Sequence, residues 1–296
     1  MKLTRKQFDI LETLAINDKL LPQRQLKEFT GYSLGTINKV MKELNELEFT
    51  KNGRITDKGF SALEPYRAKR AIFIAAGFGS RLVPITLNTP KPLVRVHGKR
   101  IIDGLIDACL QAGITEIYVV RGYLSEQFDQ LLYKYPMIKF IENPAYNETN
   151  NISSALCARY LFSNAYLFEA DLLLQKPELI KSYQYCSNFL GFHKERSDDW
   201  CFTLKDGYIA THKIGGVDCY QEYGISYWDE EAGRKLASDI KDAYELPGGK
   251  ELFWTQIPLS VFHDNYKVEV RRCNEGDVIE IDTFRELRAI DKTYNL

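Results

Sequence analysis

Ala75-Ala76-Gly77-Phe78-Gly79-Ser80-Arg81-Leu82 directly follows an apolar run, residues 71–75, that we expect to form a β-strand. Two glycines at the carboxyl end of such a strand let backbone N–H groups approach phosphates closely. Ser80 adds a hydroxyl donor and Arg81 adds a fixed positive charge. Leu82 stands where a dinucleotide-binding fingerprint needs glycine or alanine, and no Gly-Lys-Ser/Thr of a Walker loop is present. The segment therefore predicts a phosphate-binding turn of another type, although a simple tight turn is the alternative.

Downstream of this turn, apolar runs alternate with amphipathic segments. Strands are expected at residues 117–120, 138–141 and 165–170, and helices at 101–112, 125–133 and 152–161. Such alternation predicts βαβ units in a mostly parallel sheet with helices on both faces. After Leu174, short aromatic-rich strands and a helix at 232–244 suggest an antiparallel extension. The expected fold of residues 69–296 is α/β, with a Rossmann-like mixed sheet.

Residues 1–68 follow a different pattern, which we expect to form a separate domain. Apolar residues at helical spacing run from Phe8 to Ala15, Pro22 opens a second helix, and Ser33 caps a third after a Gly31-Tyr32 turn. A strand, an Asn52-Gly53 turn and a returning strand follow, and Asp57 is expected to cap a fourth helix. This order resembles the winged-helix family.

The third helix of a winged-helix domain would present Thr36, Asn38, Lys39 and Lys42 to the DNA major groove, with Arg54 in the wing. Residues 1–68 contain 12 Lys and Arg against 9 Asp and Glu, a basic excess that suits DNA. Glu43, Glu46 and Glu48 dilute that face, so a packing or dimerisation module is the alternative.

Composition limits the class of protein. Of the 296 residues, 45% are hydrophobic and 27% are charged, with a net charge of −1, which argues against disorder. Neither a membrane span nor a signal peptide is evident, so we expect a cytoplasmic protein without membrane contact. The six cysteines are never closer than 15 residues and the four histidines are scattered, which excludes a zinc knuckle formed by neighbouring residues. The oligomeric state is left open.

Three charged residues are expected to join the phosphate turn. Lys91 lies between Pro90 and Pro92, which we expect to hold it in extended backbone as a second cation on the same polyphosphate. Asp171 ends the apolar strand 166–171, and Asp282 ends another at 278–281. The two carboxylates can converge on one Mg²⁺, which binds few carboxylates together with phosphate oxygens. For Asp282, capping of the last helix is the alternative.

The stretch from Ala75 to Lys91 matches A-A-G-x-G-S/T-R-L-x-P-x-T-x-x-x-P-K, and the chain resembles the sugar-phosphate-type nucleotidyltransferases. The likeness extends over residues 70–296 and is most specific to bacterial CTP:phosphocholine cytidylyltransferases. Its details are Asn150-Asn151 with Ser154, Asp199-Trp200, residues 224–229, Phe253-Trp254 and Glu280-Ile281-Asp282.

This resemblance implies transfer of CMP from CTP to phosphocholine, with Mg²⁺ on Asp171 and Asp282. Arg81 and Lys91 would balance phosphate charge, and Ala76, Gly77, Gly79, Ser80, Asn151 and Ser154 would bind the nucleotide. Asn151 and Ser154 could instead cap a helix. Choline needs aromatic faces, for which the resemblance favours Trp200, Trp254 and Tyr227, although aromatic residues on strands more often belong to the core.

Two departures keep other acceptors open. Thr255 follows Phe253-Trp254 where the family usually has aspartate, and Leu172 follows Asp171 where a polar residue is common. A primary amine such as 2-aminoethylphosphonate or phosphoethanolamine is therefore an alternative acceptor. A DNA-binding regulator that uses the transferase fold as a metabolite sensor is a further alternative.

Overall fold

The computed structural model of the chain describes residues 2–17 and 20–295 and divides into two compact units. The smaller unit comprises Met1–Arg67 and Tyr183–Tyr185, and the larger comprises Ala68–Ser182 and Cys186–Leu296. The division falls one residue before the expected boundary. No sequence pattern indicated that Tyr183–Tyr185 belongs with the first 67 residues.

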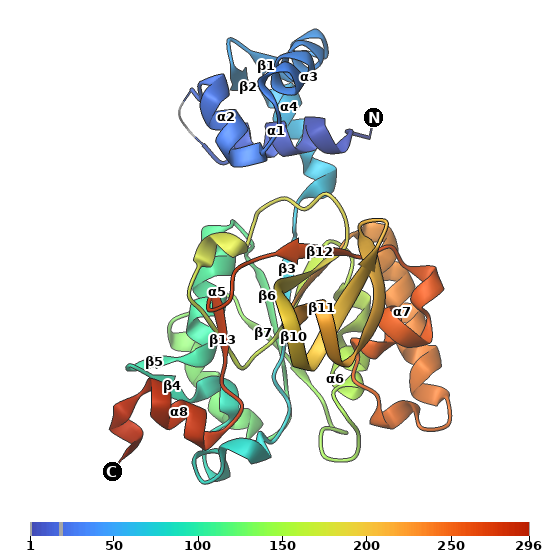
Figure 1. The fold of residues 1–296 in the computed structure, drawn as a ribbon. Coiled ribbons are helices and arrows are strands. Elements are labelled where there is room, and N and C mark those ends of the chain that lie inside the picture. The colour runs from blue at the N-terminus through green and yellow to red at the C-terminus, as the bar shows by residue number, and fades with distance from the viewer. Residues whose placement is uncertain (1, 18–19, 296) are drawn as a thin grey trace. The chain divides into compact units, whose positions relative to one another are not determined.

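In the smaller unit, three helices precede a β-hairpin and a fourth helix (Figure 1). The elements are α1 (Arg5–Ala15), α2 (Gln23–Thr30), α3 (Leu34–Glu46), β1 (Thr50–Lys51), β2 (Arg54–Ile55) and α4 (Asp57–Leu63). Ser33 caps α3 as expected, because its side chain accepts a hydrogen bond from the Thr36 N–H. The expected Asp57 cap is wrong: Thr56 has the extended backbone of a cap and accepts from the Gly59 N–H.

The larger unit is built on a seven-stranded mixed sheet in the order β10-β12-β11-β8-β3-β6-β7. Strands β8, β3, β6 and β7 are mutually parallel, and β11 joins β8 in antiparallel register. The strands of the unit are β3 (Arg70–Ile74), β4 (Arg95–Val96), β5 (Lys99–Arg100), β6 (Glu116–Arg121), β7 (Lys139–Glu142), β8 (Ala165–Glu169), β9 (Leu172–Leu174), β10 (Asn188–Lys205), β11 (Tyr208–Trp228), β12 (Glu269–Arg272) and β13 (Val278–Glu280). Two further pairs, β4–β5 and β13–β9, lie outside the main sheet.

Helices cover both faces of this sheet, as Figure 1 shows. They are α5 (Ile101–Gln111), α6 (Ile152–Ala158) and α7 (Glu230–Glu245), whereas α8 (Phe284–Ile290) packs in a separate core that includes Val96 of β4. Phe73 of β3 belongs to the core under α5, whereas its neighbours Ile72 and Ile74 belong to the core under α6 and α7. The alternation follows from the two-residue period of a strand.

The region after Leu174 differs from the short strands that the sequence suggested. β10 and β11 are 18 and 21 residues long and form one twisted hairpin joined at Asp206-Gly207. Both turn residues have positive φ, which is the geometry that Asp-Gly favours in a two-residue hairpin. The prediction from sequence did not use this Asp206-Gly207 signal, so it did not place a hairpin here.

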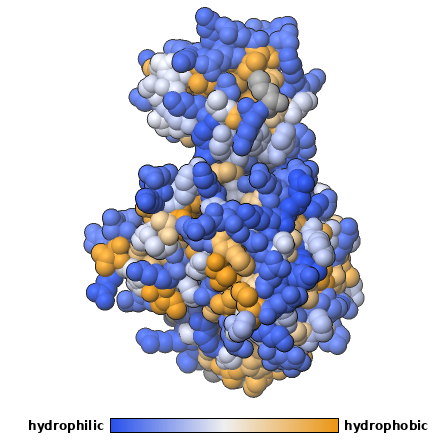
Figure 2. Space-filling model, turned by 90° about the vertical axis from the view of Figure 1, so that its right-hand side faces the viewer, coloured by the Kyte–Doolittle hydropathy of each residue, from blue (hydrophilic) through white to orange (hydrophobic). Residues whose placement is uncertain are grey.

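The face of the protein that Figure 2 shows is polar for the most part. On this face, hydrophobic residues form small groups between larger hydrophilic areas. Among residues 2–17 and 20–295, no helix has the length and apolar character that a membrane crossing requires.

Candidate active site

The turn after β3 is shaped around Lys91. Gly79 has φ of 68°, and a Cβ at this position would lie 3.1 Å from the Cβ of Lys91. Glycine therefore serves both the backbone conformation and the close approach. A single 3₁₀ turn, Ser80–Leu82, follows, and Thr86 donates a hydrogen bond to the Gly79 carbonyl at 2.9 Å. Ala76, Gly77, Gly79, Ser80 and Arg81 all line a cavity of about 320 Å³.

Lys91 lies in the wall of this cavity, with a side chain only 10% exposed. Its expected extended backbone is wrong: Lys91 begins the 3₁₀ turn Lys91–Leu93, because proline is tolerated in a first helical turn where no N–H partner is needed. The Nζ atom donates to Asp171 Oδ2 at 2.7 Å and to Asp282 Oδ1 at 3.0 Å. Burial alone would lower the pKa of the ammonium group, but the two carboxylates outweigh it and raise that pKa.

Three carboxylates converge beside Lys91. Asp171, Glu280 and Asp282 each offer an oxygen within 4.8 Å of the others. β13 pairs with β9 so that Glu280 opposes Leu172, which brings the two aspartates together. Arg81 approaches Asp282 at 2.7 Å. Thr283 is the N-cap of α8, so the structure does not support the capping alternative for Asp282.

The charges of this cluster are incompletely balanced. Burial and the nearby aspartates raise the pKa of Glu280 to about 9, and burial with Asp171 and Glu222 raises the pKa of Glu169 to about 8. Asp171 Oδ1 is buried and has no hydrogen-bond partner among the described residues. Closely spaced carboxylates with an unsatisfied oxygen fit a hard divalent cation, for which carboxylate oxygens are suitable ligands.

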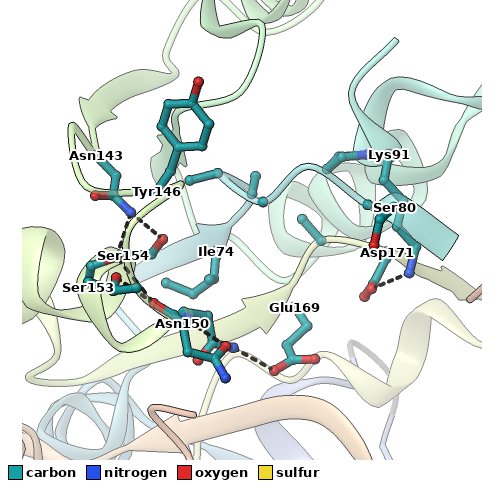
Figure 3. A pocket seen from close by; sticks show the side chains of 18 of the residues that line it. Ile74, Ser80, Lys91, Asn143, Tyr146, Asn150, Ser153, Ser154, Glu169 and Asp171 are labelled. Carbon is teal, nitrogen blue, oxygen red and sulfur yellow. Dashed lines mark hydrogen bonds and ion pairs between the residues drawn. The ribbon is translucent and has the colours of Figure 1, made fainter. Parts of the chain in front are cut away.

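The opposite wall carries amides and hydroxyls. Figure 3 shows Asn143, Ser153 and Ser154 on one side of the cavity, Lys91 and Asp171 on the other, and Glu169 between them. Asn143 donates to both serine hydroxyls, at 2.9 and 3.0 Å. This wall can present hydrogen-bonding groups to a polar ring.

Asn151 also lines the cavity, and its side chain does not cap α6. Its Oδ1 accepts from the Trp254 N–H at 2.9 Å, and its Nδ2 donates to Glu169 at 3.4 Å. Asn151 therefore joins the loop that holds Trp254 to the end of β8.

The structure separates the three expected aromatic residues. Trp200 is half-buried, stacks on His212 with ring centroids 4.5 Å apart and meets the edge of Phe253 at 6.0 Å. Tyr227 has no exposed surface and packs against Tyr166, and Trp254 is 1% exposed. None of the three rings, including that of the half-buried Trp200, lines the cavity. Tyr227 and Trp254 thus lie in the core, where their neighbours along β11 and after α7 complete the packing.

Sequence reasoning missed several polar residues of this region. Glu280 is two positions from Asp282, so the alternation of a strand could have placed both on one side. Glu169 is likewise two positions from Asp171, whereas Asn143 and the pair His212–Glu222, whose Nε2 and Oε2 atoms are 2.7 Å apart, had no local sequence pattern that could identify them.

Comparisons with known proteins agree with this geometry. A family model described as nucleotidyl transferase matches residues 70–207. A 2-aminoethylphosphonate cytidylyltransferase of Lancefieldella rimae is 35% identical over 232 residues, covering 76% of this chain and 92% of the relative. A choline-phosphate cytidylyltransferase of Streptococcus pneumoniae is 31% identical over 231 residues, covering 75% and 97%.

Solved structures give the same fold. A CTP:phosphocholine cytidylyltransferase from Streptococcus pneumoniae matches with a TM-score of 0.70 at 29% identity, covering 77% of this chain and 99% of that structure. A glucose-1-phosphate thymidylyltransferase from Bacillus anthracis matches with a TM-score of 0.61 at 17% identity, covering 76% and 94%. Because two relatives share 35% and 31% identity with it over 76% and 75% of its length, the chain belongs to the nucleotidyl transferase family.

Proposed function

We propose that the protein transfers CMP from CTP to a small aminoalkyl phosphate or phosphonate and releases pyrophosphate. The observation that carries this proposal is the meeting, in one cavity, of the 75–81 turn, the cations Arg81 and Lys91, and the carboxylates Asp171 and Asp282. The relatives named above that share at least 30% identity are cytidylyltransferases, which supports cytidine as the base.

The chemistry requires no covalent enzyme intermediate. An oxygen of the acceptor forms a bond to the α-phosphorus of CTP, the bond from that phosphorus to the β-phosphate oxygen breaks, and pyrophosphate leaves with its electron pair. The backbone of Gly77 and Gly79, with Ser80, would bind the triphosphate, and Arg81 and Lys91 would offset its charge. Mg²⁺ held by Asp171, Glu280 and Asp282 would neutralise charge on the phosphate oxygens.

For the acceptor we favour 2-aminoethylphosphonate. A quaternary ammonium cannot donate hydrogen bonds and depends on several aromatic faces. Tyr227 and Trp254 are buried, which leaves Trp200 and Phe253 as the accessible aromatic pair among the expected residues and their neighbours. A primary ammonium can also use a carboxylate such as Glu169. Phosphocholine is the second candidate, supported by the ring of Trp200.

Pyrophosphate release by the purified protein tests this function. CTP, UTP and ATP are compared with Mg²⁺ present, each with 2-aminoethylphosphonate, phosphoethanolamine, phosphocholine and glucose 1-phosphate. We expect release with CTP and the amine-containing acceptors, fastest with 2-aminoethylphosphonate. Preference for phosphocholine would keep the transferase and change the acceptor. Absence of release with every pair would contradict the proposal.

The smaller unit supports a second candidate function, binding of DNA in the manner of a winged helix. Asn38, Lys39 and Lys42 are exposed on α3, and Arg54 is exposed on the hairpin. Such residues bind phosphates and base edges in helix-turn-helix proteins. Fluorescence anisotropy with duplex DNA at low and high salt tests this, with the double variant Lys39→Glu/Lys42→Glu as comparison. Equal binding by both proteins would remove α3 from the interface.

A further inference from the structure

Glu169 is a carboxylate of the cavity wall that the proposed chemistry leaves without a role. Asp171 and Asp282 share Lys91, and Glu280 groups with them at the candidate metal site. Glu169 is outside that group and forms no ion pair among the described residues. Its one hydrogen bond there, from Asn151 Nδ2, is 3.4 Å long. A half-buried carboxylate with so few partners is costly unless a ligand completes its environment.

Strand β11 provides the space that Glu169 occupies. Gly224 lies across from the end of β8, where Ile225 pairs with Phe168. A Cβ at Gly224 would come within 2.7 Å of both the Cβ and the Cγ of Glu169. Any side chain at position 224 would therefore displace the carboxylate, so the two strands together determine where it lies.

On one side of Glu169, strand β11 leads through Glu222 to the Trp200–Phe253 pair, in which Trp200 is half-buried and Phe253 is exposed. Glu222 is two positions before Gly224 on β11 and so lies on the same face of that strand, but it is already bonded to His212 at 2.7 Å. The His212 side chain is completely buried and stacks on Trp200. Glu222 is therefore already hydrogen-bonded within the protein, whereas Glu169 can still bind a ligand.

The other side of Glu169 leads to the same aromatic pair through Asn151. The amide of Asn151 bonds both Glu169 and the backbone N–H of Trp254. The preceding residue, Phe253, meets the ring of Trp200 edge-on. These contacts connect Glu169, through Asn151 and the Phe253-Trp254 segment, to the ring of Trp200.

We propose that Glu169 selects a cationic acceptor by binding its ammonium group while the phosphate or phosphonate end faces the α-phosphate of CTP. This inference rests on the proposed function. A carboxylate and an aromatic face together favour an alkylammonium group over a neutral group of equal size, because both interactions depend on the positive charge, and the bound ammonium itself favours the ionised form of Glu169. Glu169 is thus a specificity-determining binding residue rather than a metal ligand.

The test compares acceptors that differ only in charge. 2-Aminoethylphosphonate is paired with 2-hydroxyethylphosphonate, and phosphocholine with its neutral isostere 3,3-dimethylbutyl phosphate. Steady-state kinetics are measured for the wild type, Glu169→Gln, Glu169→Asp and the control Glu245→Gln, an exposed residue at the end of α7. We expect Glu169→Gln to raise the KM of the cationic acceptor at least tenfold and to change the KM of CTP and of the neutral acceptor less than twofold.

Glu169→Asp keeps the charge, and we expect it to keep the preference for the cationic acceptor. The control should behave as the wild type. An equal rise in KM for charged and neutral acceptors would overturn the inference, and a rise in the KM of CTP alone would assign Glu169 to the nucleotide. Failure of the wild type to use any acceptor would instead contradict the proposed function. The inference about Glu169 rests on that function and would then be contradicted too.

Discussion

At the scale of single residues, Asp171 and Asp277 illustrate two uses of an acidic side chain. Asp171 lines the cavity, bonds Lys91 and is surrounded by other carboxylates. Asp277 accepts from the Asn274 N–H at 2.8 Å and pairs with Lys176 at 2.7 Å. The carboxylates around Asp171 are unfavourable for folding and suit a binding role, whereas Asp277 stabilises a turn.

Asp171→Asn should therefore lower the rate of pyrophosphate release on the order of 100-fold, the usual loss when a group that stabilises transition-state charge is removed. Because Lys91 keeps its ion pair with Asp282, its unfolding temperature should stay within about 2 °C of the wild type. Asp277→Asn should show the opposite pattern, with a lower unfolding temperature and an unchanged rate. Thermal unfolding and the release assay check both. A retained rate in Asp171→Asn would exclude its catalytic role.

Glu280 predicts a pH dependence of stability. Its pKa is raised to about 9 in the folded protein, above the ordinary value near 4.5, so the folded state binds more protons than the unfolded state between these values. Stability contributed by this group is therefore complete at low pH and is lost progressively as pH rises toward 9.

Glu280→Gln cannot ionise, so without metal its unfolding temperature should exceed that of the wild type by about 2 °C or more at pH 8. The difference should shrink as pH approaches 5. Melting curves across this range, with EDTA present, check the expectation. A gap that stays constant with pH would show that Glu280 does not titrate in this interval.

At the scale of elements, the sequence predicted helices, caps and turns better than it predicted which strands pair. The helices of both units, the Ser33 cap and the Asn52-Gly53 turn depend on residues close in the chain. The insertion of β11 beside β8, which places Gly224 over Glu169, depends on a pairing of distant segments that no local pattern encodes. The burial of Tyr227 follows from that same pairing, so the aromatic site could not be placed from sequence.

Two glycines in helices, Gly233 and Gly104, differ in the space around them, so their substitution by alanine should have opposite effects on stability. A Cβ at Gly233 of α7 would lie 2.4 Å from the Phe162 carbonyl oxygen, so Gly233→Ala must separate α7 from the chain after α6. We expect it to lower the free energy of unfolding by about 2 kcal/mol. A Cβ at Gly104 of α5 meets nothing within 4 Å, so Gly104→Ala should raise that free energy by about 0.5–1 kcal/mol.

Urea unfolding of the two glycine variants gives both values. Stabilisation by Gly233→Ala would mean that helix propensity outweighs the contact with Phe162. Destabilisation by Gly104→Ala would contradict the open surroundings of that position.

At the scale of the whole molecule, each unit has a core of its own. Leu11 is fully buried in the core of the smaller unit, together with Ile37 and Leu44. Ile106 is fully buried in the core between α5 and the sheet of the larger unit. All residues that line the candidate active-site cavity lie between Ile74 and Asp282, outside the smaller unit.

Leu11→Ala and Ile106→Ala remove equivalent apolar volume from these two cores, and each should cost about 2–5 kcal/mol in its own unit. We expect Leu11→Ala to leave the rate of pyrophosphate release at 25 °C within twofold of the wild type, because no cavity residue depends on that core. Ile106→Ala should reduce the temperature at which activity is lost, since its core supports β3 and α5. Melting curves and activity measured over the same temperatures separate the two effects. A large loss of turnover in Leu11→Ala at 25 °C would show instead that the smaller unit controls catalysis, as a regulator that couples nucleotide transfer to its own ligand would require.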